Sequence, residues 1–212
     1  MLKAATDYEV MHMTGEPTAE SLNTLGDIYV NEEMFDLAAR AYLDAYTLGD
    51  PGDVSGPLRA AEILVGRDGL SQAKDLLAET ERQAGDQLDE DSELQILRLE
   101  SRIAKAEGRD QEAAEMLEQI VELDPLDGES LILLGQHFAN SAQPEKARFL
   151  YERAANLEDF TADANVRLAQ LLVRQNKYAE AIPLLERAQQ INPRDSVEDF
   201  LDDLERFVKA KR

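Results

Sequence analysis

Four basic residues in the middle of the chain are spaced so that they could bind a carboxylate. Arg98, Arg102, Lys105 and Arg109 follow one another at i, i+4, i+7 and i+11, which predicts one face of one helix. Guanidinium and ammonium groups bind carboxylates through charge-assisted hydrogen bonds. The row therefore predicts a site for an acidic side chain or a C-terminal carboxylate. The alternative is that these bases pair with Glu62 and other acids of adjacent units.

Residues that could perform catalysis are scarce. The chain has no cysteine and only two histidines, His12 and His137, which lie far apart in sequence. It has no glycine-rich phosphate loop and no serine in a nucleophile elbow. The acidic stretch 85–93 lacks the spacing of a calcium-binding loop and is expected to be a solvated loop. The sequence predicts no enzyme, no cofactor and no metal site.

The net charge of the chain limits the kinds of molecule that it is expected to bind. The net charge is −22, and acidic residues exceed basic ones by 9 in residues 1–53, by 6 in 54–93, by 5 in 94–127 and by 2 in 128–161, with none in excess in 162–212. Nucleic acids and anionic lipid surfaces are poor partners for such a chain. A partner with a basic surface would be attracted to the N-terminal half. The alternative is that the acidic surface only keeps the protein in solution.

The sequence shows no feature of membrane insertion. It contains no apolar run near 18 residues, and its first residues lack the pattern of a signal peptide. We expect a soluble protein that is cytoplasmic by default. A periplasmic or membrane-tethered location stays open if the chain is a piece of a longer exported protein.

The elements that position these residues follow from an internal repeat of about 34 residues. Each repeat contains a small residue, an alanine 12 positions after it and a large apolar residue 16 positions after it. The small residues are Gly26, Ala61, Ser101, Gly135 and Ala169; the alanines are Ala38, Ala73, Ala113, Ala147 and Ala181; the large residues are Tyr42, Leu77, Leu117, Tyr151 and Leu185. Such self-similarity is typical of a solenoid, in which each unit buries its apolar face against its neighbours.

Each repeat predicts two amphipathic helices joined by a short turn. In the fourth repeat, Leu131, Leu134 and Phe138 form one apolar stripe, and a second stripe follows a turn that ends at Pro144. We expect the two helices to cross where the small residue of one faces the alanine of the other. At the C-terminus, residues 196–199 predict a capping box that opens a last helix.

The spacing resembles the tetratricopeptide repeat family over residues 19–193. The match is carried by Leu22, Leu25, Gly26, Tyr29, Ala38, Tyr42 and Ala45 in the first repeat, and by Leu131, Leu134, Gly135, Phe138, Ala147, Tyr151 and Ala154 in the fourth. The resemblance implies one all-α domain, a right-handed α-solenoid of antiparallel helix pairs. Its repeats would span 19–53, 54–93, 94–127, 128–161 and 162–195, between an N-terminal helix or half repeat (1–18) and a C-terminal capping helix (196–212).

The resemblance also implies that the first helices line a concave groove. By that rule the groove would present Asn31, Arg98, Arg102, Lys105, Gln136, Asn140, Gln170 and Arg174. The family's chaperone-tail clamp is not reproduced, because Asn23, Asp27, Glu62 and Val166 occupy the corresponding positions. The expected function is a non-catalytic scaffold or adaptor that holds an extended peptide or helix of a partner. The alternative is a self-assembling structural segment of a larger protein or complex.

Overall fold

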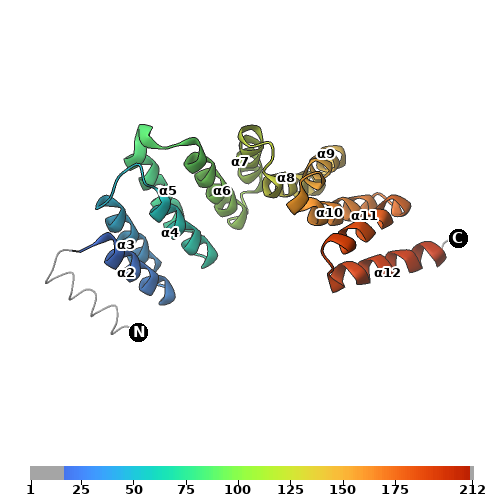
Figure 1. The fold of residues 1–212 in the computed structure, drawn as a ribbon, viewed down its shortest axis with the longest axis horizontal. Coiled ribbons are helices and arrows are strands. Elements are labelled where there is room, and N and C mark those ends of the chain that lie inside the picture. Colours follow the sequence, from blue (N-terminus) through green and yellow to red (C-terminus); the bar gives the residue numbers. More distant parts are fainter. Residues whose placement is uncertain (1–16, 211–212) are drawn as a thin grey trace. The chain divides into compact units, whose positions relative to one another are not determined.

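A computed structural model describes residues 17–210, which form eleven α-helices, α2–α12, and two short 3-10 helices, with no strand in this range (Figure 1). The chain divides into two compact units between Met116 and Leu117, within α7 (Asp110–Leu123). The predicted half repeat at 1–18 lies almost wholly outside the described residues. The prediction of an all-α fold built from paired helices is confirmed.

Unit 1, which ends at Met116, contains two complete helix pairs and the helix that follows them. Its helices are α2 (Ala19–Asn31), α3 (Phe35–Thr47), α4 (Ser55–Gly66), α5 (Leu70–Ala84) and α6 (Glu90–Ala106), with the 3-10 helix η1 (Gly85–Gln87) before α6. α2 packs on α3 and α4 packs on α5, while α4 also contacts α3 and α6. One buried apolar cluster runs through the pairs, and Tyr42, Leu64 and Leu77 are among its most buried members.

Unit 2, which begins at Leu117, repeats the plan. After α7 it contains α8 (Gly128–Asn140), α9 (Pro144–Ala155), η2 (Glu158–Phe160), α10 (Thr161–Arg174), α11 (Tyr178–Ile191) and α12 (Asp195–Ala210). α8 packs on α9, α10 packs on both α9 and α11, and α12 covers α11. Pro144 is the first residue of α9, as the sequence predicts.

Polar side chains define where several helices begin. Asp89 and Asp127 accept hydrogen bonds from the backbone N–H groups of Ser92 (2.8 Å) and Ser130 (2.9 Å), at the starts of α6 and α8. The prediction that residues 85–93 form a solvated loop is wrong in its second half, since α6 starts at Glu90. Glu90, Asp91 and Glu93 fall in the first turn of α6, where the helix dipole favours negative charge.

The last helix begins one residue earlier than predicted. α12 starts at Asp195, and the backbone carbonyl of Arg194 accepts from the N–H groups of Val197 (2.9 Å) and Glu198 (3.1 Å). Ser196 therefore lies inside the helix and does not cap it. The helix starts two residues after Pro193. Its first residue, Asp195, is an acid, which the helix dipole favours in a first turn.

The close crossings within the helix pairs differ from the prediction in one respect. Gly26 of α2 and Gly135 of α8 face tyrosine rings, not alanines: a Cβ on Gly26 would lie 2.5 Å from Cε1 of Tyr42, and one on Gly135 would lie 2.6 Å from Cε1 of Tyr151. Side chains on a helix lean toward its N-terminus, so the ring sixteen positions on covers the crossing point. Ala61 and Ala169, by contrast, belong to repeats whose large residues are Leu77 and Leu185.

Candidate functional site

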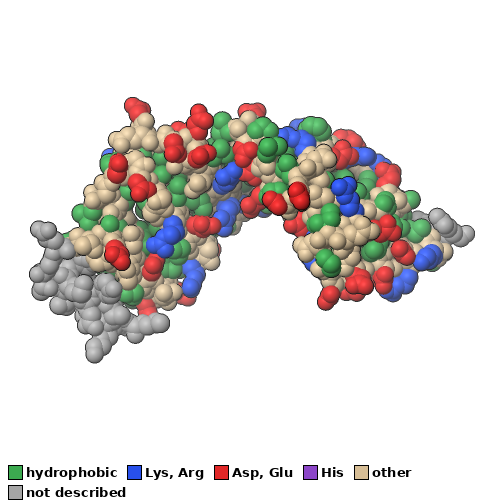
Figure 2. Space-filling model, viewed as in Figure 1, with side chains coloured by type: hydrophobic (Ala, Val, Ile, Leu, Met, Phe, Trp, Pro, Cys, Tyr) green, Lys and Arg blue, Asp and Glu red, His purple; other side chains and the backbone are tan. Residues whose placement is uncertain are grey.

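In unit 1, the first helices α2, α4 and α6 carry exposed polar side chains that contact one another from repeat to repeat. The contacts join Asp27 to Arg59 (3.9 Å), Asn31 to Arg67 (3.3 Å) and Glu62 to Arg102 (3.7 Å). We call this surface the first-helix face of unit 1. Figure 2 shows basic side chains beside acidic ones over α4 and α6. Because the charged side chains are about half exposed, solvent weakens their ion pairs.

The predicted basic row is shorter than expected. α6 ends at Ala106, and Gly108 adopts a positive φ of 75° that turns the chain, so Arg109 does not belong to that helix. Lys105 donates to Asp110 at 2.6 Å, while Arg109 pairs with both Glu107 and Glu112. The alternative in which these bases pair with Glu62 and other acids therefore describes the structure for Arg102, Lys105 and Arg109.

In unit 2, the predicted residues lie on α8 and α10. Asn140 at the end of α8 accepts a hydrogen bond from Arg174 at the end of α10, at 3.4 Å. Gln170 accepts from Arg167, one turn away on α10, at 3.5 Å. Gln136 is half-buried on α8. We call these four predicted residues, Gln136, Asn140, Gln170 and Arg174, the first-helix face of unit 2.

One contact in unit 1 was not predicted from the sequence. The hydroxyl of Tyr42 donates to Asp27 Oδ1 at 2.7 Å, which fixes the carboxylate at the edge of the first-helix face. Burial is the main cause that raises the pKa of Tyr42, and the hydrogen bond to Asp27 adds to it. In unit 2, burial likewise raises the pKa of Tyr151, but Gln136 stands where the first repeat has Asp27. The sequence feature that could have predicted this contact is Asp27 itself, an acid directly after Gly26, the glycine that faces the Tyr42 ring.

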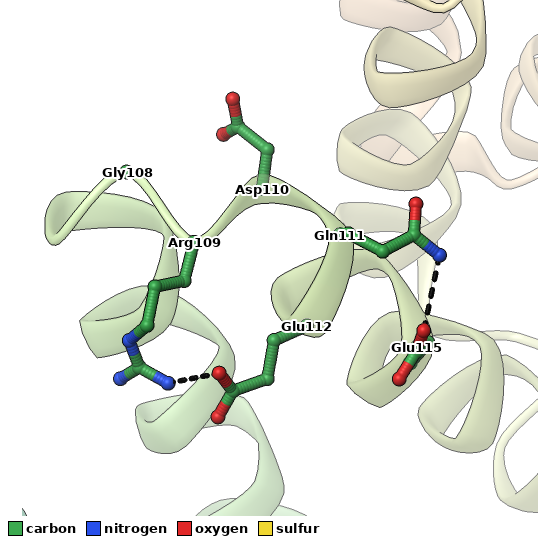
Figure 3. Close-up of a pocket in the computed structure, with 6 residues that line it drawn as sticks. All are labelled: Gly108, Arg109, Asp110, Gln111, Glu112 and Glu115. Atoms are coloured by element: carbon green, nitrogen blue, oxygen red, sulfur yellow. Dashed lines mark hydrogen bonds and ion pairs between the residues drawn. The ribbon is translucent and has the colours of Figure 1, made fainter.

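A hollow of about 610 Å³ lies beside the turn before α7 (Figure 3). All six lining residues belong to the stretch from Gly108 to Glu115. Arg109 points toward Glu112, Gln111 donates to Glu115 at 3.0 Å, and Asp110 points away from both (Figure 3). Paired charges from one continuous segment form a surface turn, so the hollow is not a candidate active site.

A smaller hollow, of about 230 Å³, lies between α2, α3 and the start of α4. It combines aromatic and acidic groups, including Tyr42, Tyr46, Asp50 and Asp53. Burial, followed by the charges of Asp50 and Asp53, raises the pKa of Tyr46. Hydrogen bonds from Ser55 lower the pKa of Asp53, so this carboxyl carries its charge at neutral pH.

No group of three or more metal-ligating side chains occurs among residues 17–210. Within the helices described, none has the length and apolar character needed to cross a bilayer. His137 is half-buried with its ring edge-on to Phe138 at 5.5 Å, and its Nε2 lies 3.4 Å from Ser141 Oγ.

Comparisons with known sequences point to one family. Residues 133–196 match the tetratricopeptide repeat family. Tetratricopeptide repeat protein 21A of Mus musculus is 33% identical over 87 residues, which are 39% of this chain and 7% of that protein. The chain thus corresponds to a small fraction of that relative's length.

Solved structures share the fold at low sequence identity. YrrB, described as a TPR protein with an unusual peptide-binding site, superposes with a TM-score of 0.61 at 17% identity, over 92% of this chain and 96% of its own. PilF of Pseudomonas aeruginosa gives 0.65 at 17% identity, over 91% and 85%. A tetratricopeptide repeat protein of Parabacteroides merdae gives 0.66 at 15% identity, over 88% and 72%. These comparisons show a tetratricopeptide repeat match at residues 133–196, and the paired helices share the fold of tetratricopeptide repeat proteins.

Proposed function

We propose that the first-helix faces bind an extended segment or a helix of a partner protein. Tetratricopeptide repeat folds serve in general as non-catalytic protein-interaction scaffolds. YrrB, which has this fold, is described with a peptide-binding site, so peptide recognition is chemistry that such helices support.

The observation that carries the proposal is the loose ion pair between Glu62 and Arg102. Its two charged atoms lie 3.7 Å apart, and the side chains are 65% and 44% exposed. An exposed pair of this kind contributes little to stability, so a carboxylate of a ligand can replace Glu62 at small cost. Arg98 lies one turn away from Arg102 on the same helix and carries the same charge. In unit 1, therefore, the ligand would be an acidic segment.

In unit 2, the same face offers mostly amides. Gln136, Asn140 and Gln170 each carry a donor and an acceptor, which suits the N–H and C=O groups of a peptide backbone. Arg174, held by Asn140, adds a cation at the end of the row. This face would hold the backbone of a segment bound to unit 2, whereas the face of unit 1 would select acidic segments.

Charge reversal in unit 1 tests the proposal. The double variant Arg98→Glu/Arg102→Glu should weaken binding of a hexaglutamate peptide at least ten-fold in titration calorimetry. Arg82→Glu on α5 is the matched control, because Arg82 is also exposed but lies on a second helix. Equal affinities for the double variant and the original chain would rule out peptide binding at this face.

The acidic N-terminal half favours a second contact, with a basic surface of the partner. The hollow that contains Asp50 and Asp53 combines negative charge with the ring of Tyr46, which suits a lysine or arginine side chain. Association with an oligolysine peptide should slow steeply as salt is raised. An association rate that does not depend on salt concentration, or that is the same in Asp50→Asn/Asp53→Asn as in the original chain, would exclude this contact.

The alternative function is self-assembly as a structural segment of a larger protein or complex. A chain that acts as an adaptor by itself is expected to be monomeric. Light scattering across a range of concentrations separates the two functions, because a mass that grows with concentration favours self-assembly.

A further inference from the structure

An exposed phenylalanine on α9 departs from the pattern of the repeats. Phe149 lies two positions after Ala147, and the residues at the same place in the other four repeats are Arg40, Asp75, Glu115 and Pro183. The side chain of Phe149 is 60% exposed. An apolar side chain stabilises a fold through the area that it buries, so a ring in this position contributes little to the core. Packing within the repeat therefore does not account for this residue.

Two exposed leucines adjoin Phe149. Leu123 at the end of α7 is 62% exposed, and Leu126 in the turn before α8 is 71% exposed. Arg153 joins this turn to α9, because its Nη2 donates to the backbone carbonyl of Pro125 at 3.0 Å and its guanidinium lies over the ring of Phe149, 5.8 Å from the ring centroid. We call Leu123, Leu126 and Phe149 the apolar patch of unit 2. Single exposed apolar residues are ordinary on a protein surface, but an adjoining group of them indicates an interaction site.

The charges around the apolar patch are mainly acidic. Residues 117–153, which include the whole patch, contain seven acidic residues and three basic ones. Glu122 directly precedes Leu123 and is exposed. Glu145 is also exposed, and it lies one turn before Phe149 on the same side of α9. A partner surface of complementary charge must therefore be basic.

The combination of apolar and acidic groups favours a helix as the occupant. In an amphipathic helix, apolar residues at i, i+3, i+4 and i+7 form a stripe, and basic residues can flank that stripe on both sides. The stripe would contact the apolar patch while the flanking bases contact the acids at its edge. In an extended segment, successive side chains point to opposite faces, so bases that alternate with apolar residues would point away from those acids.

We propose that the apolar patch of unit 2 binds a basic amphipathic helix of a partner protein. The patch lies on a second helix, α9, and on the end of α7 and the turn that follows, and none of its residues belongs to the first-helix face of unit 2. The inference therefore does not depend on peptide binding at the first-helix faces. It is also separate from the contact proposed at Asp50 and Asp53, since that hollow lies in unit 1.

The test titrates the full chain with a helical peptide of about 14 leucine and lysine residues, in which the leucines follow at i, i+3, i+4 and i+7. Nitrogen–proton correlation spectra should show shifts of the backbone amides of Leu126 and Phe149. A peptide with the same lysines but with serine in place of leucine should bind this site about ten-fold more weakly, because it buries less apolar area. Equal binding of the two peptides, or shifts that do not involve Leu126 and Phe149, would overturn the proposal.

Phe149→Gln separates docking from a structural role. Because the ring is mostly exposed, the variant should melt within about 2 °C of the original chain, yet it should bind the leucine–lysine peptide about ten-fold more weakly. Leu37→Gln is the matched control, since Leu37 is a 44% exposed apolar residue of another second helix, α3, and this variant should keep the original affinity. A clearly lower melting temperature would assign Phe149 to the fold and refute a docking role, and an unchanged affinity would refute it directly.

Two further variants separate this site from the others. Glu122→Gln/Glu145→Gln should weaken peptide binding and make it less dependent on salt, and equal affinity at all salt concentrations would exclude a basic partner. Arg98→Glu/Arg102→Glu should leave the peptide-dependent shifts of the apolar patch in place, which keeps this test distinct from that of the first-helix face. Light scattering examines a second copy as the occupant. A mass that grows with concentration in the original chain but not in Phe149→Gln would assign the patch to self-association and overturn the proposal.

Discussion

The ring of Tyr42 occupies the space that a side chain on Gly26 would need. A Cβ there would lie 2.5–2.7 Å from three atoms of the ring, which real Cβ atoms do not tolerate. The ring itself is held, since Tyr42 is 1% exposed and its hydroxyl donates to Asp27. The glycine is therefore required by its partner, and not by its own backbone conformation.

Gly26→Ala should lower the free energy of unfolding by about 1–3 kcal/mol, because the added methyl group overpacks the crossing of α2 and α3. Chemical denaturation followed by circular dichroism measures the loss. Gly66→Ala is the control: among the described residues, a Cβ on Gly66 would meet no neighbouring atom within 4 Å, so that variant should be neutral or slightly stabilising. Adding Tyr42→Leu to Gly26→Ala should recover part of the loss, and failure to do so would argue against a steric cause.

Glu100 gives a pH-dependent prediction. Burial, and then the charge of Glu81, raise the pKa of its carboxyl above the ordinary value. A carboxyl whose pKa is raised by folding destabilises the folded state at pH values above that pKa. The penalty is relieved as pH falls through the folded pKa toward the unfolded value near 4.3.

Glu100→Gln should therefore raise the free energy of unfolding at pH 7 by roughly 0.5–1 kcal/mol, and by less at pH 4. Denaturation curves at the two pH values provide the measurement. Glu186→Gln on the exposed surface of α11 serves as the control and should change little at either pH. A gain that is the same at both values would contradict the assigned cause.

The start of α8 depends on one carboxylate. Asp127 accepts from the N–H of Ser130 at 2.9 Å and is 9% exposed. Asp127→Ala should destabilise unit 2 by about 1 kcal/mol, whereas Asp127→Asn keeps an acceptor and should cost less. Hydrogen exchange of the first α8 amides would localise the effect. Equal losses in the two variants would mean that the cap is not the cause.

The pair between Glu62 and Arg102 should matter little for folding. Both side chains are largely exposed, so a double-mutant cycle with alanine should give a coupling of about 0.2–1 kcal/mol, decreasing as salt is raised. Thermal denaturation of the four proteins completes the cycle. A larger and salt-independent coupling would assign the pair to the fold and remove the reason to expect a ligand there.

Periodicity was sufficient to predict the helix pairs. The apolar stripes and the proline at 144 indicate the paired helices and where α9 begins, because each depends on local spacing or backbone geometry. The residue that faces Gly26 and Gly135 was predicted wrongly, since it is the tyrosine sixteen positions on and not the alanine. The predicted helix ends were wrong where a single residue decides whether the helix stops or starts one position earlier or later. Gly108 ends α6 before Arg109, and the backbone at Arg194 starts α12 before Ser196.

The candidate site was less predictable than the fold. Spacing indicated that Arg102 and Asn140 lie on first helices and offered pairing with Glu62 as one of two alternatives, but it did not indicate that Asn140 contacts Arg174. Those contacts depend on the distance between adjacent repeats, which no single helix encodes. Phe149 could have been found from the sequence by comparing each position across repeats, since it is aromatic where three of the others are charged. Its link through Arg153 to the turn before α8, however, is visible only in three dimensions.

The size of the small residue at each crossing is matched to the size of the large residue that faces it, and this match differs between repeats. Glycine occurs in the repeats whose large residue is tyrosine, and alanine in the second and fifth, whose large residue is leucine. If α4 took the place of α2 beside α3, the Cβ of Ala61 would clash with the ring of Tyr42; if α2 took the place of α4 beside α5, Gly26 would leave a void beside Leu77. Size matching at the crossings can thus discriminate between correct and mispaired helices in a chain of similar hairpins.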